Sequence, residues 1–422
     1  MMAHDATTSD RRLDDLGSRM FYIPGLIGLV SLVVSLLIGM IGGNWIAFGR
    51  SYLVAFMFIL SMCLGALFFT AIHHATRAGW STVLRRISET VASNLMWIWV
   101  LFLPIVACML WTDLYRWRDP GTSEILLNKT PFLNVGVYCG LSFLFFGVWA
   151  LLGRFYYNNS VAQDSSGDVS LTHRMQALAP LALLVYAFSQ SYGVILWLMS
   201  LEPEWFSTMY PVGFFATSCC GFFSLQIVIM FLLQKAGKLK NEITIEHYQD
   251  AGKLLFAFGI VFWTYIGFSQ YMLIYYANIP EETGWFLTRQ IGSWGPFSLV
   301  LLAGHFVLPF LALVTKHTKR AKGVLVTIAC GMLVMHYIDI YWLIKPIVPN
   351  HVFHEARTYS EVVQRVADEN LTLGFGWTFL DLTSLVALVG IFMAGTFRKL
   401  QSASLIPEQD PRLGESLAFE NY

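Results

Sequence analysis

Titratable side chains fall inside the long apolar segments of this 422-residue chain, and the clearest are His305, His336, Asp339 and Asp381. A rise of about 1.5 Å per residue along each segment puts all four in the same half of a membrane. His336 and Asp339 are three residues apart, so they share one face of a helix. Titratable groups are costly in a bilayer unless they pair or line a water-filled path. These groups must therefore be satisfied by one another, by other helices or by water.

Three interpretations of this cluster stay open. In the first, the two histidines, Asp339 and Asp381 conduct protons, because imidazole and carboxyl groups can bind and release protons in proteins near neutral pH. In the second, His305 and His336 face each other and ligate a b-type haem, although an aspartate one turn from His336 suits a hydrogen-bond network better. In the third, the four groups hydrogen-bond to one another and fix the register of the helices.

Other polar groups extend the candidate proton path toward both membrane surfaces. Gln270 lies in the same half as the histidines, Tyr265 lies near the middle of its segment, and Gln226 lies in the opposite half. Asp250 and Lys253 mark the mouth of the segment that carries Tyr265. These two also have the spacing of an ordinary ion pair at the start of a helix. If the path exists, we expect these five residues to complete it.

The elements that must position these residues are membrane-spanning helices. Hydrophobic residues make up 56% of the chain and charged residues 13%, and the mean hydropathy is +0.58. Apolar segments recur at about the twenty-residue length that a helix needs to cross a bilayer. We expect an all-α polytopic protein with ten transmembrane helices, at about residues 21–43, 50–73, 91–112, 133–153, 175–199, 210–234, 251–277, 294–315, 323–345 and 376–397.

The distribution of Lys and Arg predicts the orientation of these helices. Most of the 27 basic residues lie in the terminal tails and in alternate loops. By the positive-inside rule, both termini are expected on the cytoplasmic side. A membrane domain of residues 21–399 is flanked by polar tails at 1–20 and 400–422, and we expect partners alone to order these tails. The basic loop 74–90 could lie on the membrane surface as a short amphipathic helix.

Several classes of site are not expected in this chain. The six cysteines all fall within the apolar segments, without the spacing that holds zinc or iron–sulfur clusters, so we expect no metal site. The net charge is zero and no run of basic residues is interleaved with aromatics, so nucleic acid is not an expected partner. Trp205, Trp285 and Trp342 lie near segment ends, where tryptophans mark the membrane boundary.

Distinctive motifs follow one another along the chain: HHATRAGWSTVLRRISE (73–89), WLMSLEPEWFST (197–208), EHYQDAGKLLFAF (246–258), FSQYMLIYYANIPEET (268–283), GHFVLPF (304–310) and MHYIDIYWL (335–343). With these motifs the chain resembles the polysulfide-reductase-like (NrfD-like) membrane subunits. Within that family it is most similar to the smaller such subunit of bacterial alternative complex III. Leu196 and Glu204 depart from the pattern of these relatives, which usually have Asp and His at the two positions.

The resemblance implies a fold, a location and a set of partners. The fold would be two four-helix bundles, at about residues 50–199 and 210–345, with the first and last helices peripheral. The chain would be a multi-pass subunit of a quinol:cytochrome c (or high-potential iron–sulfur protein) oxidoreductase in the bacterial cytoplasmic membrane. Its partners would be a larger NrfD-like subunit, an iron–sulfur subunit, c-type haem subunits and the lipid bilayer. The clusters and haems would belong to those partners, with quinol as substrate of the complex and no cofactor in this chain.

The resemblance also suggests a role for the chain, which we expect not to catalyse a reaction alone. It would be a scaffold and a candidate proton-conducting subunit. The alternative is a quinol-binding subunit whose pocket is lined by Gln270, Tyr271, His305 and Asp339. A solute transporter is a third and weaker possibility. Transporters use helices that are broken near the membrane midplane in matching halves, whereas Pro104 and Pro309 interrupt their segments at places that do not correspond.

Overall fold

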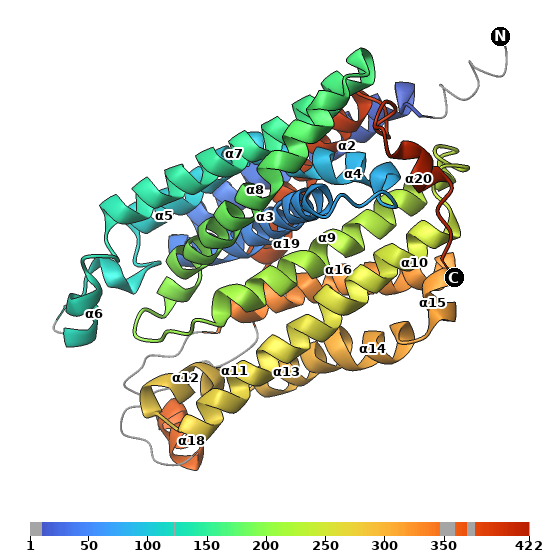
Figure 1. The fold of residues 1–422 in the computed structure, drawn as a ribbon. Coiled ribbons are helices and arrows are strands. Elements are labelled where there is room, and N and C mark those ends of the chain that lie inside the picture. Colours follow the sequence, from blue (N-terminus) through green and yellow to red (C-terminus); the bar gives the residue numbers. More distant parts are fainter. Residues whose placement is uncertain (1–10, 122, 347–358, 369–375, 422) are drawn as a thin grey trace, which may run out of the picture.

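The computed structural model describes residues 11–121, 123–346, 359–368 and 376–421. Within these ranges the regular elements are all helices, and no strand occurs among them. In this part of the chain, nine helices are long and apolar enough to cross a membrane, and a tenth span results if one bent pair of helices crosses as a unit. Most of the long helices run along a common direction (Figure 1). The described chain is therefore an all-helical, multi-pass membrane protein.

The nine long spans coincide with nine of the predicted apolar segments. Their bounds are α2 (Asp14–Ile41), α3 (Trp45–Ala75), α7 (Val135–Ser166), α8 (Val169–Trp197), α9 (Tyr210–Lys235), α10–η5–α11 (Ile245–Leu254, Leu255–Phe262 and Trp263–Ala277), α13–η6–α14 (Trp294–Leu302, Ala303–Val307 and Leu308–Leu313), α16 (Lys322–Ile344) and α19 (Phe379–Gln401). Short helices lie between and after them: η3 (Arg116–Arg118), α6 (Glu124–Lys129), η4 (Met199–Leu201), α12 (Pro280–Thr288), α15 (Lys316–Arg320), α18 (Tyr359–Asp368) and α20 (Leu413–Leu417).

The third predicted segment is not one straight helix. The bent pair that covers it begins earlier than predicted, with α4 (Thr82–Ser93). It continues through η1 (Asn94–Met96), η2 (Ile98–Phe102) and α5 (Leu103–Trp111), with a bend of 53° after Met96. At the bend, Trp97 leaves the helical region with a φ of −133°. Pro104 has no N–H to donate to the carbonyl four residues earlier, which favours a break in the regular hydrogen-bond pattern just before it. The sequence segment is thus present but broken.

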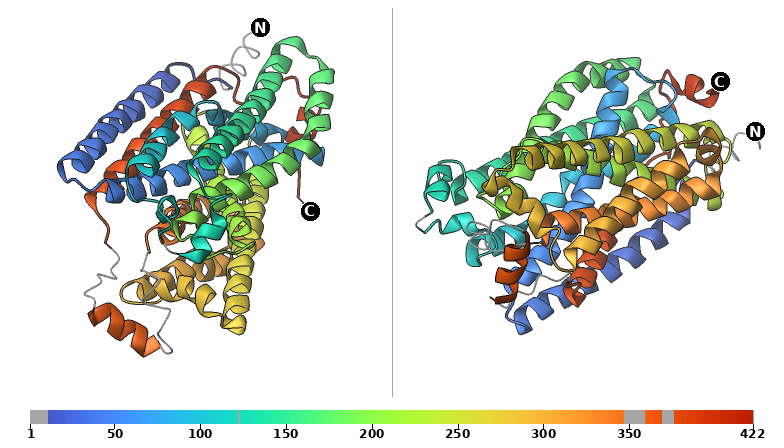
Figure 2. Two further views of the ribbon diagram at one scale, coloured as in Figure 1. Left: turned by 90° about the vertical axis from the view of Figure 1, so that its left-hand side faces the viewer. Right: turned by 90° about the horizontal axis from the view of Figure 1, so that it is seen from below.

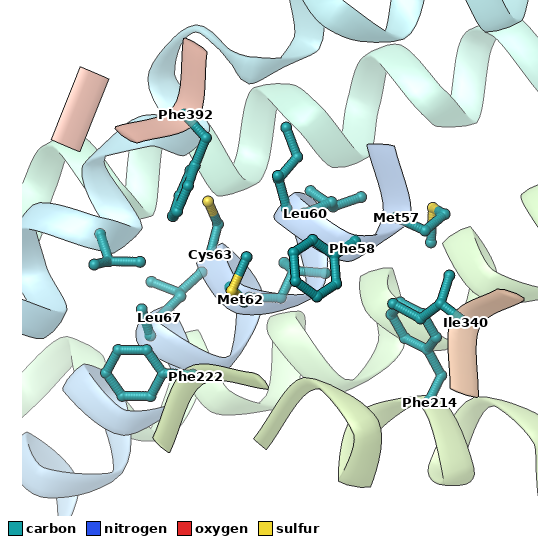
Figure 3. Close-up of a cluster of buried hydrophobic side chains, with 14 of the residues drawn as sticks. Met57, Phe58, Leu60, Met62, Cys63, Leu67, Phe214, Phe222, Ile340 and Phe392 are labelled. Carbon is teal, nitrogen blue, oxygen red and sulfur yellow. The ribbon is translucent and has the colours of Figure 1, made fainter. Parts of the chain in front are cut away.

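Helix α3 lies at the centre of the helices. It packs against α4, α8, α9, α16 and α19, and almost all of its side chains are buried. Figure 3 shows side chains of α3 among residues of α9, α16 and α19. A Cβ atom at Gly65 would clash with the carbonyl oxygen of Ser218, so this glycine permits α3 and α9 to approach closely. The division into two four-helix bundles stays a prediction.

The first and last spans form a pair (Figure 2). α2 packs mainly on α19, and α19 also packs on α3. Small residues make this contact close, since a Cβ atom at Gly28 would lie 2.8 Å from the backbone of α19. Most of α2 is exposed, as expected for a peripheral helix. α19 is more buried than α2, because it packs on both α2 and the central α3, and α2 also contacts α3.

The C-terminal tail is docked on the helices at the end opposite α12. Leu405 and Ile406 are fully buried, and Leu405 donates its N–H to the carbonyl of Arg11 over 2.8 Å. Ser416 is also buried; it accepts from the N–H of Val83 over 3.2 Å. The expectation that only partners order this tail is therefore wrong for residues 402–421. The first ten residues lie outside the described part of the chain.

The basic loop at residues 74–90 does not form a membrane-surface helix. Every residue of α4 is buried, and its two arginines enter a cluster of charges. Arg86 pairs with Asp164 over 2.8 Å and with Glu89 over 3.2 Å. Arg85 pairs with Glu89 and with Asp410 of the tail. A buried arginine needs a carboxylate partner, and both of these arginines have one. A helix on the membrane surface would leave its arginines exposed and would not need such partners.

Candidate functional site

A cavity of about 1010 Å³ lies at the end of the helices that carries α12. Its walls come mainly from α9, α11, α13 and α16, and α12 with the residues after it covers another side. Most of the lining side chains are aromatic or aliphatic, and the polar ones include Thr217, Gln270, Arg289 and Asp339. Cavities of this size with a few convergent polar groups bind small amphipathic molecules.

Asp339 is the acidic group of this cavity. It is 2% exposed, and its Oδ2 atom accepts hydrogen bonds from Thr217 Oγ1 over 2.6 Å and from Trp263 Nε1 over 3.0 Å. In the described part of the chain, no donor reaches the Oδ1 atom. The carboxyl group is therefore fixed through one oxygen, while the other is available to a molecule in the cavity. Hydrogen bonds to a charged acceptor are the stronger kind, so this orientation is well determined.

Trp263 links Asp339 to His305. The indole and the imidazole are stacked, with ring centroids 4.0 Å apart and an interplanar angle of 12°. His305 is fully buried, and its Nε2 atom lies 3.1 Å from the carbonyl oxygen of Gly259. His305 itself does not line the cavity, which corrects its predicted place in the pocket wall. It instead supports the residue that holds Asp339.

Both segments that meet at His305 are π-helical. η5 contains Gly259 and η6 contains His305, and the two segments are in contact. Each has a glycine where another helix comes close: a Cβ atom at Gly259 would lie 2.9 Å from the Cα of Cys220, and one at Gly304 would clash with the sulfur of Met335. π-helical turns are rare and occur frequently at functional sites. Their presence beside the cavity supports a functional role for this region.

His336 occupies a separate environment one turn from Asp339. Its Nε2 atom lies 2.9 Å from Ser61 Oγ, and its ring packs on Phe58 with centroids 5.0 Å apart. A Cβ atom at Gly221 would lie 2.5 Å from the same Nε2 atom, so the imidazole fills the space that this glycine leaves. His305 and His336 therefore each have protein partners of their own at Nε2, which gives no support to a shared haem.

Asp381 is not part of the Asp339 environment. It forms the capping box of α19 with Thr378, whose N–H donates to Oδ2 over 2.8 Å. Its Oδ1 atom pairs with Lys345 Nζ over 2.6 Å, and Lys345 also donates to Ser51 Oγ over 2.8 Å. This set of contacts ties α3, α16 and α19 together. Within the described residues, no hydrogen bond or ion pair joins Asp381 to Asp339 or to either histidine.

The predicted quinol pocket is close to the observed cavity. Gln270, Tyr271 and Asp339 line it, which is three of the four residues predicted for that pocket. Gln270 is largely buried and donates from Nε2 to Ser207 Oγ over 2.9 Å. Tyr271 is more exposed, and its hydroxyl accepts from Gln290 over 3.5 Å. The structure therefore gathers a pocket-sized part of the predicted site, and not a continuous polar chain.

The remaining members of the predicted proton path are scattered. Tyr265 is 62% exposed, so within this chain its side chain lies apart from the buried members of the predicted path. Gln226 is fully buried on α9, and neither atom of its amide has a hydrogen-bond partner in the described chain. Asp250 and Lys253 form the ordinary ion pair of the alternative interpretation, over 2.5 Å, and both contact Asn421 of the tail.

Arg289 is a site residue that sequence reasoning missed. It lines the cavity, yet its side chain is only 1% exposed. Its guanidinium lies over the ring of Trp285 at 3.6 Å and pairs with Glu202 over 3.3 Å. Burial raises the pKa of the Glu202 carboxyl, and the Arg289 guanidinium opposes that rise. An arginine four residues after a tryptophan, in a loop with few bases, was the signal in the sequence.

The tryptophans around Arg289 are not simply boundary residues. Trp205 and Trp285 are each 4% exposed and stack with centroids 4.6 Å apart. Trp342 packs edge-on to Trp285 at 5.3 Å. The three rings and the guanidinium form one packed layer next to the cavity. The assignment of these tryptophans to the membrane boundary is therefore incomplete, because two of them also line the cavity, Trp285 and Trp342.

No protein-family model and no curated protein matches this chain. Within the described residues, no group of three or more His, Cys, Asp or Glu side chains is arranged to hold a metal ion.

Proposed function

We propose that this chain is a membrane subunit of a quinol-oxidising electron-transport complex, of the quinol:cytochrome c (or high-potential iron–sulfur protein) oxidoreductase type, and that its cavity binds the quinol. The proposal combines the motif resemblance with the geometry of the cavity. An apolar cavity with a small number of fixed polar groups suits a molecule with a polar ring and a hydrophobic tail. The electron-carrying clusters and haems would belong to partner subunits.

The observation that carries the proposal is the carboxyl group of Asp339, the one acidic side chain among the described residues that line the cavity. Oxidation of a quinol to a quinone releases two electrons and two protons. Asp339 offers a carboxylate oxygen at the cavity, held in orientation by Thr217 and Trp263. Such a group can accept a hydrogen bond from a quinol hydroxyl and take one of the two protons as the electrons pass to the centres of the partner subunits. It must release that proton before it can take the second. Gln270 offers an amide group on the same wall.

Proton conduction remains a second candidate, because His336 lies one turn from Asp339 along α16. Both side chains are directed at α9, where their neighbours Thr217 and Gly221 are also one turn apart. A proton released at Asp339 would therefore have the imidazole of His336 one turn away on the face of α16 that packs on α9. The scaffold role implied by the resemblance is compatible with either function.

The test is quinol oxidation by the purified complex. An Asp339→Asn variant keeps the shape of the side chain but cannot accept a proton. We expect the complex to assemble and turnover with decyl-ubiquinol and cytochrome c to fall by about 10²–10⁴-fold, the usual contribution of a positioned proton acceptor. Asp368→Asn, at an exposed site on α18, is the matched control and should retain normal turnover. Normal turnover in Asp339→Asn would refute the proposed role of this cavity.

A further inference from the structure

Three residues of the cavity wall are each held by the loop between α8 and α9, at residues 198–209. Glu202 pairs with Arg289 over 3.3 Å. Trp205 stacks on Trp285 at 4.6 Å. Ser207 accepts a hydrogen bond from Gln270 over 2.9 Å, and this glutamine likewise lines the cavity. None of the three loop residues lines the cavity, so the loop acts on it from behind the wall.

Arg289 is the most constrained of the three partners. Its guanidinium donates to the backbone carbonyls of Trp285 over 2.8 Å, of Trp342 over 3.1 Å and of Leu343 over 3.1 Å. These bonds fasten the end of α12 to the end of α16. Glu202 supplies the charged acceptor, over 3.3 Å. Without that carboxylate, the arginine would be a buried cation with neutral acceptors, which is a strongly unfavourable arrangement.

We infer that the α8–α9 loop and α12 form one latch over the cavity, in which Glu202 positions Arg289 and Trp285. The quinol as ligand rests on the proposed function, whereas the latch itself does not. With the pair closed, Trp285 lies between Trp205 and the guanidinium, and the wall has its observed shape. When the pair opens, the guanidinium loses its charged acceptor, so the bonds of Arg289 that fasten α12 to α16 weaken and the wall is less firmly fixed. A partner that binds the α8–α9 loop would act on the cavity through the same contacts.

The latch predicts how strongly the affinity of the cavity for its ligand depends on Glu202. A ligand that binds only the closed wall has its apparent affinity reduced by the fraction of molecules in which the wall is closed. If loss of the Glu202 charge leaves the wall closed in roughly a tenth of the molecules, the affinity falls roughly tenfold. The structural alternative is that Glu202 only neutralises a buried charge, and that its loss affects the whole protein evenly.

The chain offers a close control for this distinction. Glu204 lies two residues further along the same loop, and its charge acts on Lys129 rather than on Arg289. Glu202→Gln and Glu204→Gln are therefore the same chemical change on either side of Pro203. Glu202→Asp keeps the charge and shortens the side chain, so it should restore part of the effect. Ser207→Ala removes a different tie of the same loop, and it keeps the inference testable if Glu202→Gln does not assemble.

The experiment measures backbone hydrogen exchange and quinone binding in the assembled complex. In Glu202→Gln, we expect faster exchange confined to residues 283–291 and a roughly tenfold weaker affinity for decyl-ubiquinone. Glu204→Gln should match wild type in both, and Glu202→Asp should lie between. Ser207→Ala should weaken binding in the same direction, with a smaller effect because it removes a neutral hydrogen bond.

The outcomes separate the latch from the proposed function. If wild type binds decyl-ubiquinone while Glu202→Gln changes neither exchange at 283–291 nor affinity, the latch is wrong and the quinol proposal stands. If wild type does not bind the quinone but Glu202→Gln still loosens residues 283–291, the latch stands and the quinol proposal fails. Equal loosening over the whole chain would also overturn the latch, because it would show a general loss of stability.

Discussion

Trp263 and His305 stack with ring centroids 4.0 Å apart, and the same indole donates its Nε1–H to Asp339. The tryptophan thus has a polar edge on the cavity carboxyl group and an apolar face on a buried imidazole. His305 is in turn fixed by the carbonyl of Gly259 in the facing π-helix. The orientation of the Asp339 carboxyl group therefore depends on Trp263 in the cavity wall and, behind it, on His305, which does not line the cavity.

The indole N–H can be tested separately from the indole ring. A Trp263→Phe variant keeps an aromatic face against His305 but removes one of the two donors to Asp339. A hydrogen bond to a charged group contributes about 1.5–3 kcal/mol. We expect normal assembly and a roughly tenfold loss of quinol oxidation, which is smaller than the loss in Asp339→Asn. Trp99→Phe, at an exposed tryptophan, is the control and should have no effect.

One outcome would contradict this role of the indole N–H. Wild-type turnover in Trp263→Phe, with Asp339→Asn inactive, would show that Thr217 alone orients the carboxyl group. The indole N–H of Trp263 would then not be needed to orient Asp339.

Packing around His336 leads to a stability prediction. A methyl group at Gly221 would lie 2.5 Å from His336 Nε2, so Gly221→Ala must displace the imidazole from its place beside Ser61. Overpacking of this kind costs about 1–3 kcal/mol. We expect a lower thermal unfolding midpoint by differential scanning fluorimetry in detergent.

Gly331 provides the comparison for this substitution. It lies on α16 with nothing within 4 Å of its Cβ position, so Gly331→Ala should leave the midpoint unchanged or raise it slightly, because alanine favours a helix. Equal midpoints for the two alanine variants would contradict the packing argument.

Much of the fold could be predicted because span length is imposed by the bilayer. The exceptions have local causes. The third segment contains Pro104, which marks the break but does not reveal that the bend lies at Trp97. The tail at 400–422 reads as polar, yet a few apolar residues, including Leu405 and Ile406, are enough to dock it. The overall composition of the tail is polar, so it does not show that these few apolar residues are enough to hold the tail on the helices.

The site could be predicted in part because polar groups in a membrane segment are conspicuous. Asp339, Gln270 and Tyr271 stand out in this way, and the structure places all three on the cavity. The face that carries Tyr265 could not be predicted, because this residue follows the π-helix η5. An inserted residue rotates the helix after it by about 100° relative to a regular pattern. A regular period of about 3.6 residues therefore does not predict which side chains after η5 point into the protein and which point outward.

The docked tail predicts that Asp410 stabilises the other end of the protein. It is buried and pairs with Arg85, which also contacts Glu89. Asp410→Asn keeps the shape but removes the charge; loss of one partner of a buried pair costs up to about 3–5 kcal/mol, and Glu89 should reduce that cost. We expect release of the tail, measured as faster trypsin cleavage after Arg412. The control Glu420→Gln, at an exposed site in the same tail, should be cleaved at the wild-type rate. Equal cleavage of the two variants would contradict a role of the Asp410–Arg85 pair in holding the tail.

The orientation of the chain in its membrane can be tested at its two ends. The α8–α9 loop and the docked tail lie at opposite ends of the helices (Figure 1). The positive-inside rule predicts that the tail is cytoplasmic and that the loop faces the other side.

Thr208 and Glu420 are exposed, so a cysteine at either position should react with a soluble thiol reagent. In intact cells, an impermeant maleimide should label Thr208→Cys, while Glu420→Cys should require permeabilised cells. The unaltered chain is the background control, because its exposed Cys330 lies within span α16 and should not react with a membrane-impermeant reagent. Labelling of both variants from the same side would contradict an odd number of crossings between the loop and the tail, and labelling in the reverse order would place both termini outside.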